Sequence, residues 1–279
     1  MRAILLIIAM AAAQALAAGP KYFPTPEAAV EELVAAAKAK DAKHLLAIFG
    51  PDAKGLAGTG EVRGRFVRAY EEARSIESSG SRAILVVGRQ EWPFPIPLVK
   101  DGAGWRFDTA AGKAEILNRR IGQNELSAIK AALAYVDAQR EYYLRNPRND
   151  KLLQYAQRIA SSQGKRDGLY YPVKRGEPPS PLGQLHAHPK GEPYHGYRYR
   201  VLKAQGPDAP GGAYSYVANG KMIGGFALVA YPAQYGASGV MTFIVSHEGV
   251  VHEKDLGPDT AALAGKMTRF NPDASWKRH

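Results

Sequence analysis

The chain has 279 residues, no cysteine, and 37 Lys and Arg residues against 26 Asp and Glu residues, which gives a formal net charge of +11 at pH 7. A chain without cysteine forms no disulfide and has neither thiolate chemistry nor a cysteine-ligated metal. The basic residues are scattered and form no stripe interleaved with aromatic residues. We therefore expect no nucleic-acid partner, and the charge is compatible with solubility or with weak attraction to an anionic polymer.

Residues 1–17 predict a signal peptide that is removed on export. Arg2 supplies a positive n-region, Ile4–Ala13 is an apolar run too short to span a bilayer, and Ala15-Leu16-Ala17 is a small-x-small cleavage pattern. The alternative is a buried N-terminal helix. No later stretch is long and apolar enough to span a membrane, so we expect a mature chain without a membrane span, located in the periplasm or outside the cell.

Residues 20–118 predict a small α+β module. Thr25-Pro26-Glu27 is typical of a helix start, and helical spacing of apolar residues recurs up to Ser75. Two apolar runs follow, Ala83–Val87 and the proline-rich Trp92–Val99, and Asp101-Gly102 predicts a hairpin turn. Helices followed by a twisted antiparallel sheet form the cone-like order found in folds that resemble nuclear transport factor 2, and this analogy of pattern implies no function.

Residues 119–279 predict a second α+β module. After a short helix capped by Asp108, we expect the longest helix to run from Asn124 to Arg145. Because it has two coverable faces, we expect it to be packed on two sides, between the first module and a later sheet. The residues expected to be most buried share one arc of the helix: Leu126, Ile129, Leu133 and Val136.

A Gly- and Pro-rich stretch, Ser161–Gly196, separates this helix from the expected sheet. A loop of this length within a compact protein is usually functional or mobile. The expected antiparallel meander then comprises Tyr197–Val201, Tyr214–Val217, Ile223–Tyr231, Val240–Val245 and Val250-Val251.

Several motifs together resemble an uncharacterised family of exported bacterial proteins, number 2950 in the series of domains of unknown function. They are Asp108–Gly112, Arg119–Glu125, Tyr194–Tyr197, and Gly224–Pro232 running on to Asp255–Gly257. The resemblance covers nearly the whole mature chain. It implies a family and export, and it implies no activity.

The C-terminal half also resembles the soluble domain of type IV pilins and pseudopilins. The residues that carry this resemblance are the helix ending at Arg145, Ala230-Tyr231-Pro232 and Gly239–Val245. Pilins have an apolar N-terminal half of that helix, whereas Asp108–Asn124 is polar here. We therefore do not predict filament assembly.

The candidate ligand-binding residues lie at the junction between the modules. Arg119 and Arg120 precede the expected helix start at Asn124 and Glu125, where free backbone amides and two guanidinium groups would form an anion site. The alternative is a network of salt bridges between the modules that fixes the helix start. His195 and Tyr197 complete the set.

Other histidines carry weaker signals. His186, His188 and His195, with Glu192, have a spacing that a metal could use, but exposed loop histidines are commoner and we predict no metal site. An acid/base pair could likewise be built around His247 and His252, but a solvated strand end is the commoner case. No nucleophile elbow, phosphate loop or dinucleotide motif is present, so we predict neither catalytic residues nor a cofactor.

These observations predict an exported envelope protein of unknown function, most simply a non-catalytic module that binds a partner through the intermodule groove or the long loop. An envelope protein or an anionic polymer is the expected class of partner. The alternative is a hydrolase that acts on cell-wall or other anionic substrates through the junction residues.

Overall fold

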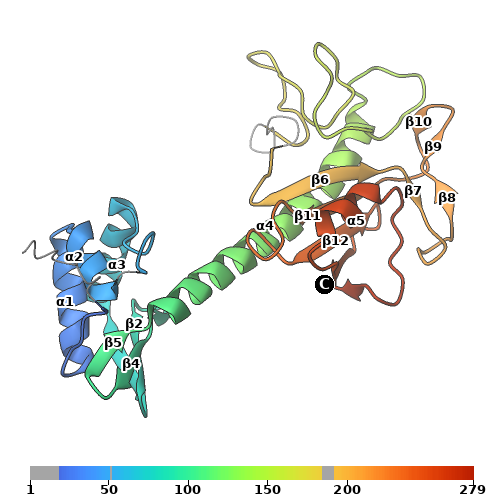
Figure 1. Cartoon of the computed structure of the whole chain (residues 1–279). Coiled ribbons are helices and arrows are strands. Elements are labelled where there is room, and N and C mark those ends of the chain that lie inside the picture. The colour runs from blue at the N-terminus through green and yellow to red at the C-terminus, as the bar shows by residue number, and fades with distance from the viewer. Residues whose placement is uncertain (1–18, 51, 184–191) are drawn as a thin grey trace, which may run out of the picture. The chain divides into compact units, whose positions relative to one another are not determined.

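The structure is a computed structural model that describes residues 19–50, 52–183 and 192–279 (Figure 1). The predicted signal peptide and its cleavage pattern lie outside the described residues, as do His186 and His188. The chain divides into two compact units, Met1–Leu117 and Asn118–His279. Within the described ranges, no helix combines the length and the apolar character needed to cross a bilayer.

The first unit contains three helices and an antiparallel sheet. The helices are α1 (Pro26–Lys38), α2 (Ala42–Phe49) and α3 (Gly60–Glu72), and the strands are β1 (Arg74–Ser79), β2 (Arg82–Val87), β3 (Trp92–Pro93), β4 (Leu98–Asp101) and β5 (Gly104–Phe107). The strand order is β1-β2-β4-β5, and β3 pairs with β2. The core lies between the helices and the sheet and includes Leu33, Ile48, Leu85 and Phe107.

Local sequence explains most boundaries in this unit. The Thr25 hydroxyl accepts a hydrogen bond from the amide of Ala28 and caps α1. The expected strand Trp92–Val99 is divided into β3 and the start of β4. Pro95 and Pro97 lie between them, and proline has no N–H for a ladder partner.

The helix that follows, α4 (Thr109–Arg145), is one continuous element. Asp108 does cap it, because its carboxylate accepts a hydrogen bond from the amide of Ala111 at 3.1 Å. The prediction of a separate long helix starting at Asn124 was wrong. No proline interrupts α4, and a single internal glycine such as Gly122 costs a helix only about 1 kcal/mol.

The buried face of α4 also differs from the predicted one. Ile129 and Val136 are buried, but Leu126 and Leu133 are 52% and 41% exposed, so the prediction of two-sided burial was wrong. The helix instead buries small and hydrogen-bonding side chains: Ala128, Ala132, Tyr135, Ala138, Gln139 and Tyr142. The polar groups on this face have partners elsewhere in the second unit: Tyr135 bonds to Ala227 of the sheet, and Gln139 and Tyr142 bond to the segment that follows the helix.

The second unit is built on a five-stranded antiparallel sheet with the order β14-β13-β12-β11-β6. Its strands are β6 (Tyr197–Leu202), β11 (Ala227–Pro232), β12 (Met241–Ser246), β13 (Val251–Asp255) and β14 (Lys277–Arg278). Two small ladders pair β7 (Ala204–Gln205) with β8 (Tyr214–Ser215), and β9 (Val217–Ala218) with β10 (Lys221–Met222).

Figure 1 shows the C-terminal part of α4 behind this sheet and α5 (Thr260–Lys266) in front of it. The predicted Asn219-Gly220 turn is present between β9 and β10, and both of its residues have positive φ angles, 49° and 76°. The α+β class, with a long helix followed by an antiparallel sheet, is thus confirmed.

Candidate functional site

Three of the predicted site residues come together around the turn 238–241. The side-chain amide of Asn124 donates to the carbonyl of Ser238 at 2.9 Å. One carboxylate oxygen of Glu125 accepts from two successive amides of the turn, at 2.9 and 3.0 Å. The Tyr197 hydroxyl donates to a carbonyl of the same turn at 2.9 Å. The polar groups proposed for ligand binding are therefore bonded to the chain itself.

Burial and close packing reinforce this network. Burial, and then the neighbouring Glu125 carboxylate, raise the pKa of Tyr197 far above its usual value, so its hydroxyl stays a neutral donor. A Cβ at Gly239 would lie 2.2 Å from that hydroxyl oxygen, which explains the glycine there. The arrangement fixes the turn against α4, which is a structural role.

The remaining predicted residues do not join them in an anion site. Arg119 is half-buried and Arg120 is exposed, and both lie within the continuous helix. The amides after Asn124 are therefore bonded inside α4, and the predicted helix start, with its free amides, was wrong. His195 is exposed, has a φ of 49° and packs edge-on against the ring of Tyr194. That any of these residues binds a ligand stays a prediction.

A pocket of about 650 Å³ lies elsewhere in the second unit. One wall is the segment 157–163, and the other is β6 with its neighbour β11. The lining side chains are aromatic and aliphatic, with three arginines, one acid and several uncharged polar groups: Ala131, Tyr135, Gln157, Arg158, Ile159, Ala160, Ser161, Ser162, Gln163, Leu182, Glu192, Tyr194, Arg198, Tyr199, Arg200, Val201, Leu228 and Tyr231. The sequence did not single out this pocket, although its first wall overlaps the start of the predicted functional loop.

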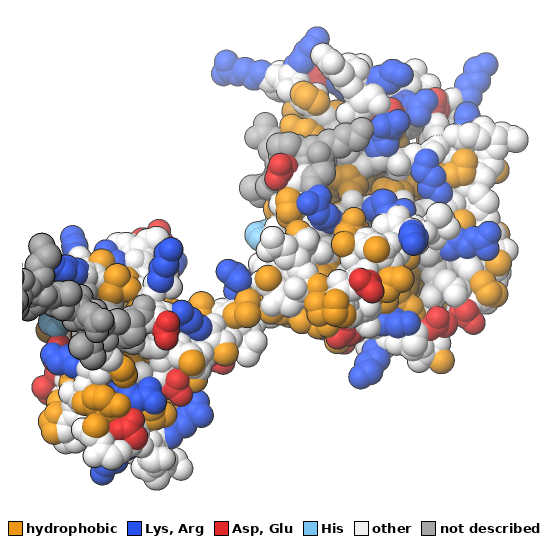
Figure 2. Space-filling model, in the orientation of Figure 1, with side chains coloured by type: hydrophobic (Ala, Val, Ile, Leu, Met, Phe, Trp, Pro, Cys, Tyr) orange, Lys and Arg blue, Asp and Glu red, His pale blue; other side chains and the backbone are white. Residues whose placement is uncertain are grey.

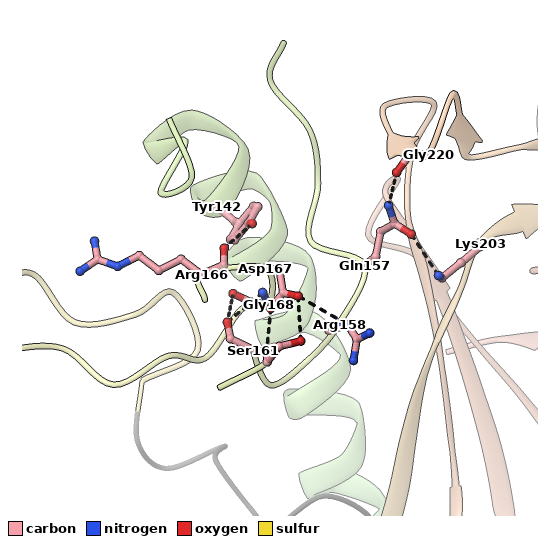
Figure 3. A network of polar contacts seen from close by, with 10 residues as sticks. Tyr142, Gln157, Arg158, Ser161, Arg166, Asp167, Gly168, Lys203 and Gly220 are labelled. Carbon is pink, nitrogen blue, oxygen red and sulfur yellow. Dashed lines mark hydrogen bonds and ion pairs between the residues drawn. The ribbon is translucent and has the colours of Figure 1, made fainter. Parts of the chain in front are cut away.

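The beginning of the first wall is fixed to the sheet side of the unit (Figure 3). The side-chain amide of Gln157 donates to the carbonyl of Gly220 at 2.8 Å, and its oxygen accepts from the Lys203 ammonium at 3.0 Å. One side chain therefore joins the wall to the β9–β10 hairpin and to the residue after β6.

The rest of that wall is held by the chain that returns after it. The Asp167 carboxylate accepts from the amide and the hydroxyl of Ser162, at 2.7 and 2.9 Å, and lies 3.7 Å from the Arg158 guanidinium. The Tyr142 hydroxyl of α4 donates to the carbonyl of Arg166 at 2.6 Å. Figure 3 shows these bonds converging on one tight loop beside the helix.

The titration of these groups reflects the same contacts. Partial burial alone would raise the pKa of Asp167, but the two hydrogen bonds from Ser162, together with Arg158, lower it below its usual value. Asp167 is therefore a carboxylate at neutral pH. Burial raises the pKa of Tyr142 to about 12, so its hydroxyl is a neutral donor.

The lining of the pocket combines tyrosines and aliphatic side chains with charged and polar ones. Among its described lining residues there is no histidine, and burial raises the pKa of both Tyr135 and Tyr199 well above the usual value. No group of three or more His, Asp or Glu residues that could hold a metal occurs in the described ranges. Figure 2 shows Lys and Arg side chains scattered over the visible surface of the unit rather than gathered on one basic face.

Comparison with known proteins adds a family. No curated protein and no solved structure matches the chain, so the resemblance of its C-terminal half to pilins stays a prediction. Residues 20–279 match a family model described as a protein of unknown function, DUF2950. Because this match covers nearly the whole chain, the protein belongs to the DUF2950 family.

Proposed function

We propose that the chain is an exported envelope protein whose C-terminal unit binds a ligand, without transforming it, in the pocket between segment 157–163 and β6. The observation that carries the proposal is the pocket itself. Its volume of about 650 Å³ falls within the range of ligand pockets, and apolar and aromatic side chains with a few polar groups are the usual lining of such sites.

The construction of the pocket supports binding in a second way. Gln157, Asp167 and Tyr142 hold its first wall through side-chain hydrogen bonds before any ligand arrives. A wall that is already ordered loses less conformational entropy on binding. Arg158 is already paired with Asp167, whereas the guanidinium of Arg200 is held by main-chain carbonyls, so its positive charge suits an anionic ligand.

The hydrolase alternative has less support. The aliphatic hydroxyl groups that line the pocket belong to Ser161 and Ser162. Each is hydrogen-bonded within the wall, Ser161 to Gly168 and Ser162 to Asp167, instead of to a histidine that could take its proton. A nucleophilic hydroxyl needs such a base beside it.

A pocket-filling substitution tests the binding proposal. Ala131 of α4 lines the pocket, whereas Ala134 lies on the same helix and does not. Ala131→Phe should abolish fluorescence enhancement of 8-anilinonaphthalene-1-sulfonate, an aromatic anion, while Ala134→Phe should retain it. The wild type and the two variants are then dialysed to equilibrium against envelope extract, and the retained species are identified by mass spectrometry. At least one species should be retained by the wild type and by Ala134→Phe but not by Ala131→Phe. If no species depends on Ala131, the proposal is wrong.

Export is tested separately. The mature protein isolated from its native host should begin at or near Ala18, since the cleavage pattern ends at Ala17. Recovery of chains that mostly begin at Met1 would contradict export through a cleaved signal peptide.

A further inference from the structure

The second wall of the pocket is the edge of a β-sheet. Strand β6 is the last strand in the order β14-β13-β12-β11-β6 and, in the described part of the chain, pairs with β11 alone. The opposite edge is formed by β14, which is only two residues long and consists of Lys277 and Arg278. Very short edge strands resist pairing with another chain, whereas β6 is six residues long and, although it carries Arg198 and Arg200, contains no proline that would interrupt a new ladder.

The ladder of β11 identifies which groups of β6 point outward. Residues of an antiparallel strand bond alternately to one neighbour and to the other. The amide of His247 donates to the carbonyl of Phe226, so even-numbered residues of β11 bond to β12 and odd-numbered residues bond to β6. In the register of β6 on β11, those odd-numbered residues lie opposite Arg198, Arg200 and Leu202.

The other residues of β6 therefore direct their N–H and C=O groups away from the sheet. Tyr197 bonds outward in this way, exchanging both of its backbone bonds with Tyr194, at 2.8 and 3.0 Å. The next two outward residues are Tyr199 and Val201. Among the described residues, no hydrogen bond is made to their backbone groups, which leaves two donors and two acceptors in a row.

The pocket lies along this edge. Successive side chains of a strand point to opposite faces of its sheet. Tyr199 and Val201 belong to one face and Arg198 and Arg200 to the other, yet all four line the same pocket. A pocket that touches both faces of β6 must run past its free edge, where the four backbone groups are.

We propose that the ligand of this pocket is an extended peptide that adds to β6 as a further antiparallel or parallel strand, an inference that rests on the binding function proposed above. Pairing with Tyr199 and Val201 supplies the main-chain bonds. From the usual strand rise and the strand and sheet spacings, one extended residue occupies about 160 Å³. The pocket of about 650 Å³ therefore accommodates about four residues.

The surroundings of the two faces of β6 determine which types of side chain the peptide carries on each side. On the face of Tyr199 and Val201 the pocket is lined by Ala131 and Tyr135 of α4, so peptide residues on this side are apolar. On the other face the guanidinium of Arg200 is held by main-chain carbonyls of the α5 region, which leave its positive charge uncompensated. Peptide residues on that side are acidic. The expected ligand thus alternates apolar and acidic residues.

The probes are hexapeptides acetylated and amidated at their ends, titrated against the full mature chain by fluorescence anisotropy of a labelled copy. We expect alternating valine and glutamate to bind more tightly than alternating valine and lysine. Methylating the backbone nitrogens of alternate residues removes donors without changing side chains, and in one of the two registers it should weaken binding by about tenfold or more.

A second set of variants removes a backbone N–H donor from β6 instead of from the peptide. Val201→Pro deletes an outward N–H and should abolish peptide binding, whereas Val201→Thr retains that N–H and should bind. Ser78→Pro is the control, because Ser78 lies on β1, the exposed edge strand of the other unit. The amide of Gly88 donates to the carbonyl of Ala73, so odd-numbered residues of β1 bond to β2 and the N–H of Ser78 points outward. If Val201→Pro does not fold, the methylated peptides still test the inference on the wild-type chain.

The outcomes separate the two proposals. If methylation leaves the affinity unchanged in both registers, or if no peptide of the series binds, the peptide inference is wrong. If an extract species requires Ala131 but is retained by Val201→Pro, the pocket binds something other than an added strand, and only the binding function stands. If nothing requires Ala131, the binding function itself fails.

Discussion

Gln139 offers the sharpest test of how the second unit is held together. Its side chain is fully buried in α4, and its amide nitrogen donates to the carbonyl of Ala156 at 2.8 Å and to the Tyr135 hydroxyl at 2.9 Å. Its oxygen accepts from the amide of Ala156 at 2.8 Å. A single side chain therefore satisfies both backbone groups of a buried residue that precedes the pocket wall.

Replacing Gln139 by leucine retains most of the volume and removes these bonds. The N–H and C=O of Ala156, which is 1% exposed, would remain buried without partners. Each unsatisfied buried group costs about 1–3 kcal/mol, so the free energy of unfolding of the second unit should fall by about 2–6 kcal/mol. Tyr135 loses less, because its hydroxyl still donates to the carbonyl of Ala227 at 3.2 Å.

The measurement must resolve the two units, since a chain with two units need not unfold in one transition. Urea unfolding followed by far-UV circular dichroism gives the free energy, and hydrogen exchange read by mass spectrometry assigns the loss to residues 155–158. Leu133→Ala, on the exposed side of the same helix, is the control and should cost less than about 1 kcal/mol. If Gln139→Leu is as stable as the control and exchange is unchanged, the network does not hold the wall.

The other predictions concern neighbouring contacts. Asp167→Asn should lower the melting temperature at pH 7. Because the folded-state pKa lies below the ordinary 3.8, the carboxylate stabilises fully above that value, and the difference from the wild type should shrink as the pH falls from there through the lower folded-state pKa. Glu125→Ala should cost about 1–3 kcal/mol in urea unfolding, and Glu125→Gln, which retains an acceptor, should cost less. Val136→Ala should lower the free energy of unfolding by about 1.5–3 kcal/mol, more than the control Leu133→Ala, because Val136 is buried and Leu133 is not.

The fold class could be predicted from the sequence because period and turn chemistry are local. The Thr25 cap, the Asp108 cap and the Asn219-Gly220 turn all act within a few residues. The course of α4 depended on weaker signals. Arg119, Arg120, Asn124 and Glu125 were interpreted as a junction with a helix start, yet no proline breaks the helix there and it continues.

The buried face of α4 could not be predicted from the sequence for a similar reason. Counting hydrophobic residues favours Leu126 and Leu133 over alanine, tyrosine and glutamine. The preference reverses only when the partners of Tyr135, Gln139 and Tyr142 are known, and these lie elsewhere in the chain.

The candidate pocket shows the same limit. The alternation of Tyr197–Val201 predicts a strand, and the long loop after α4 predicts a functional segment. Whether a strand is central or at an edge is decided by strand order, which no local pattern encodes. The sequence therefore favours the junction residues, where two arginines and an expected helix start predict an anion site, over the edge of β6.

The pocket wall explains why the sheet ends at β6. The backbone of the wall bonds to the chain that returns after it: the amide of Ser161 donates to the carbonyl of Tyr170 at 2.9 Å, and the amide of Tyr170 donates to the carbonyl of Ile159 at 2.8 Å. Because these groups bond to the returning chain, and Ala156 bonds to Gln139, the segment borders β6 without extending its ladder. Among the described residues, the outward backbone groups of Tyr199 and Val201 therefore have no hydrogen-bond partner, and these are the groups with which the proposed peptide would pair.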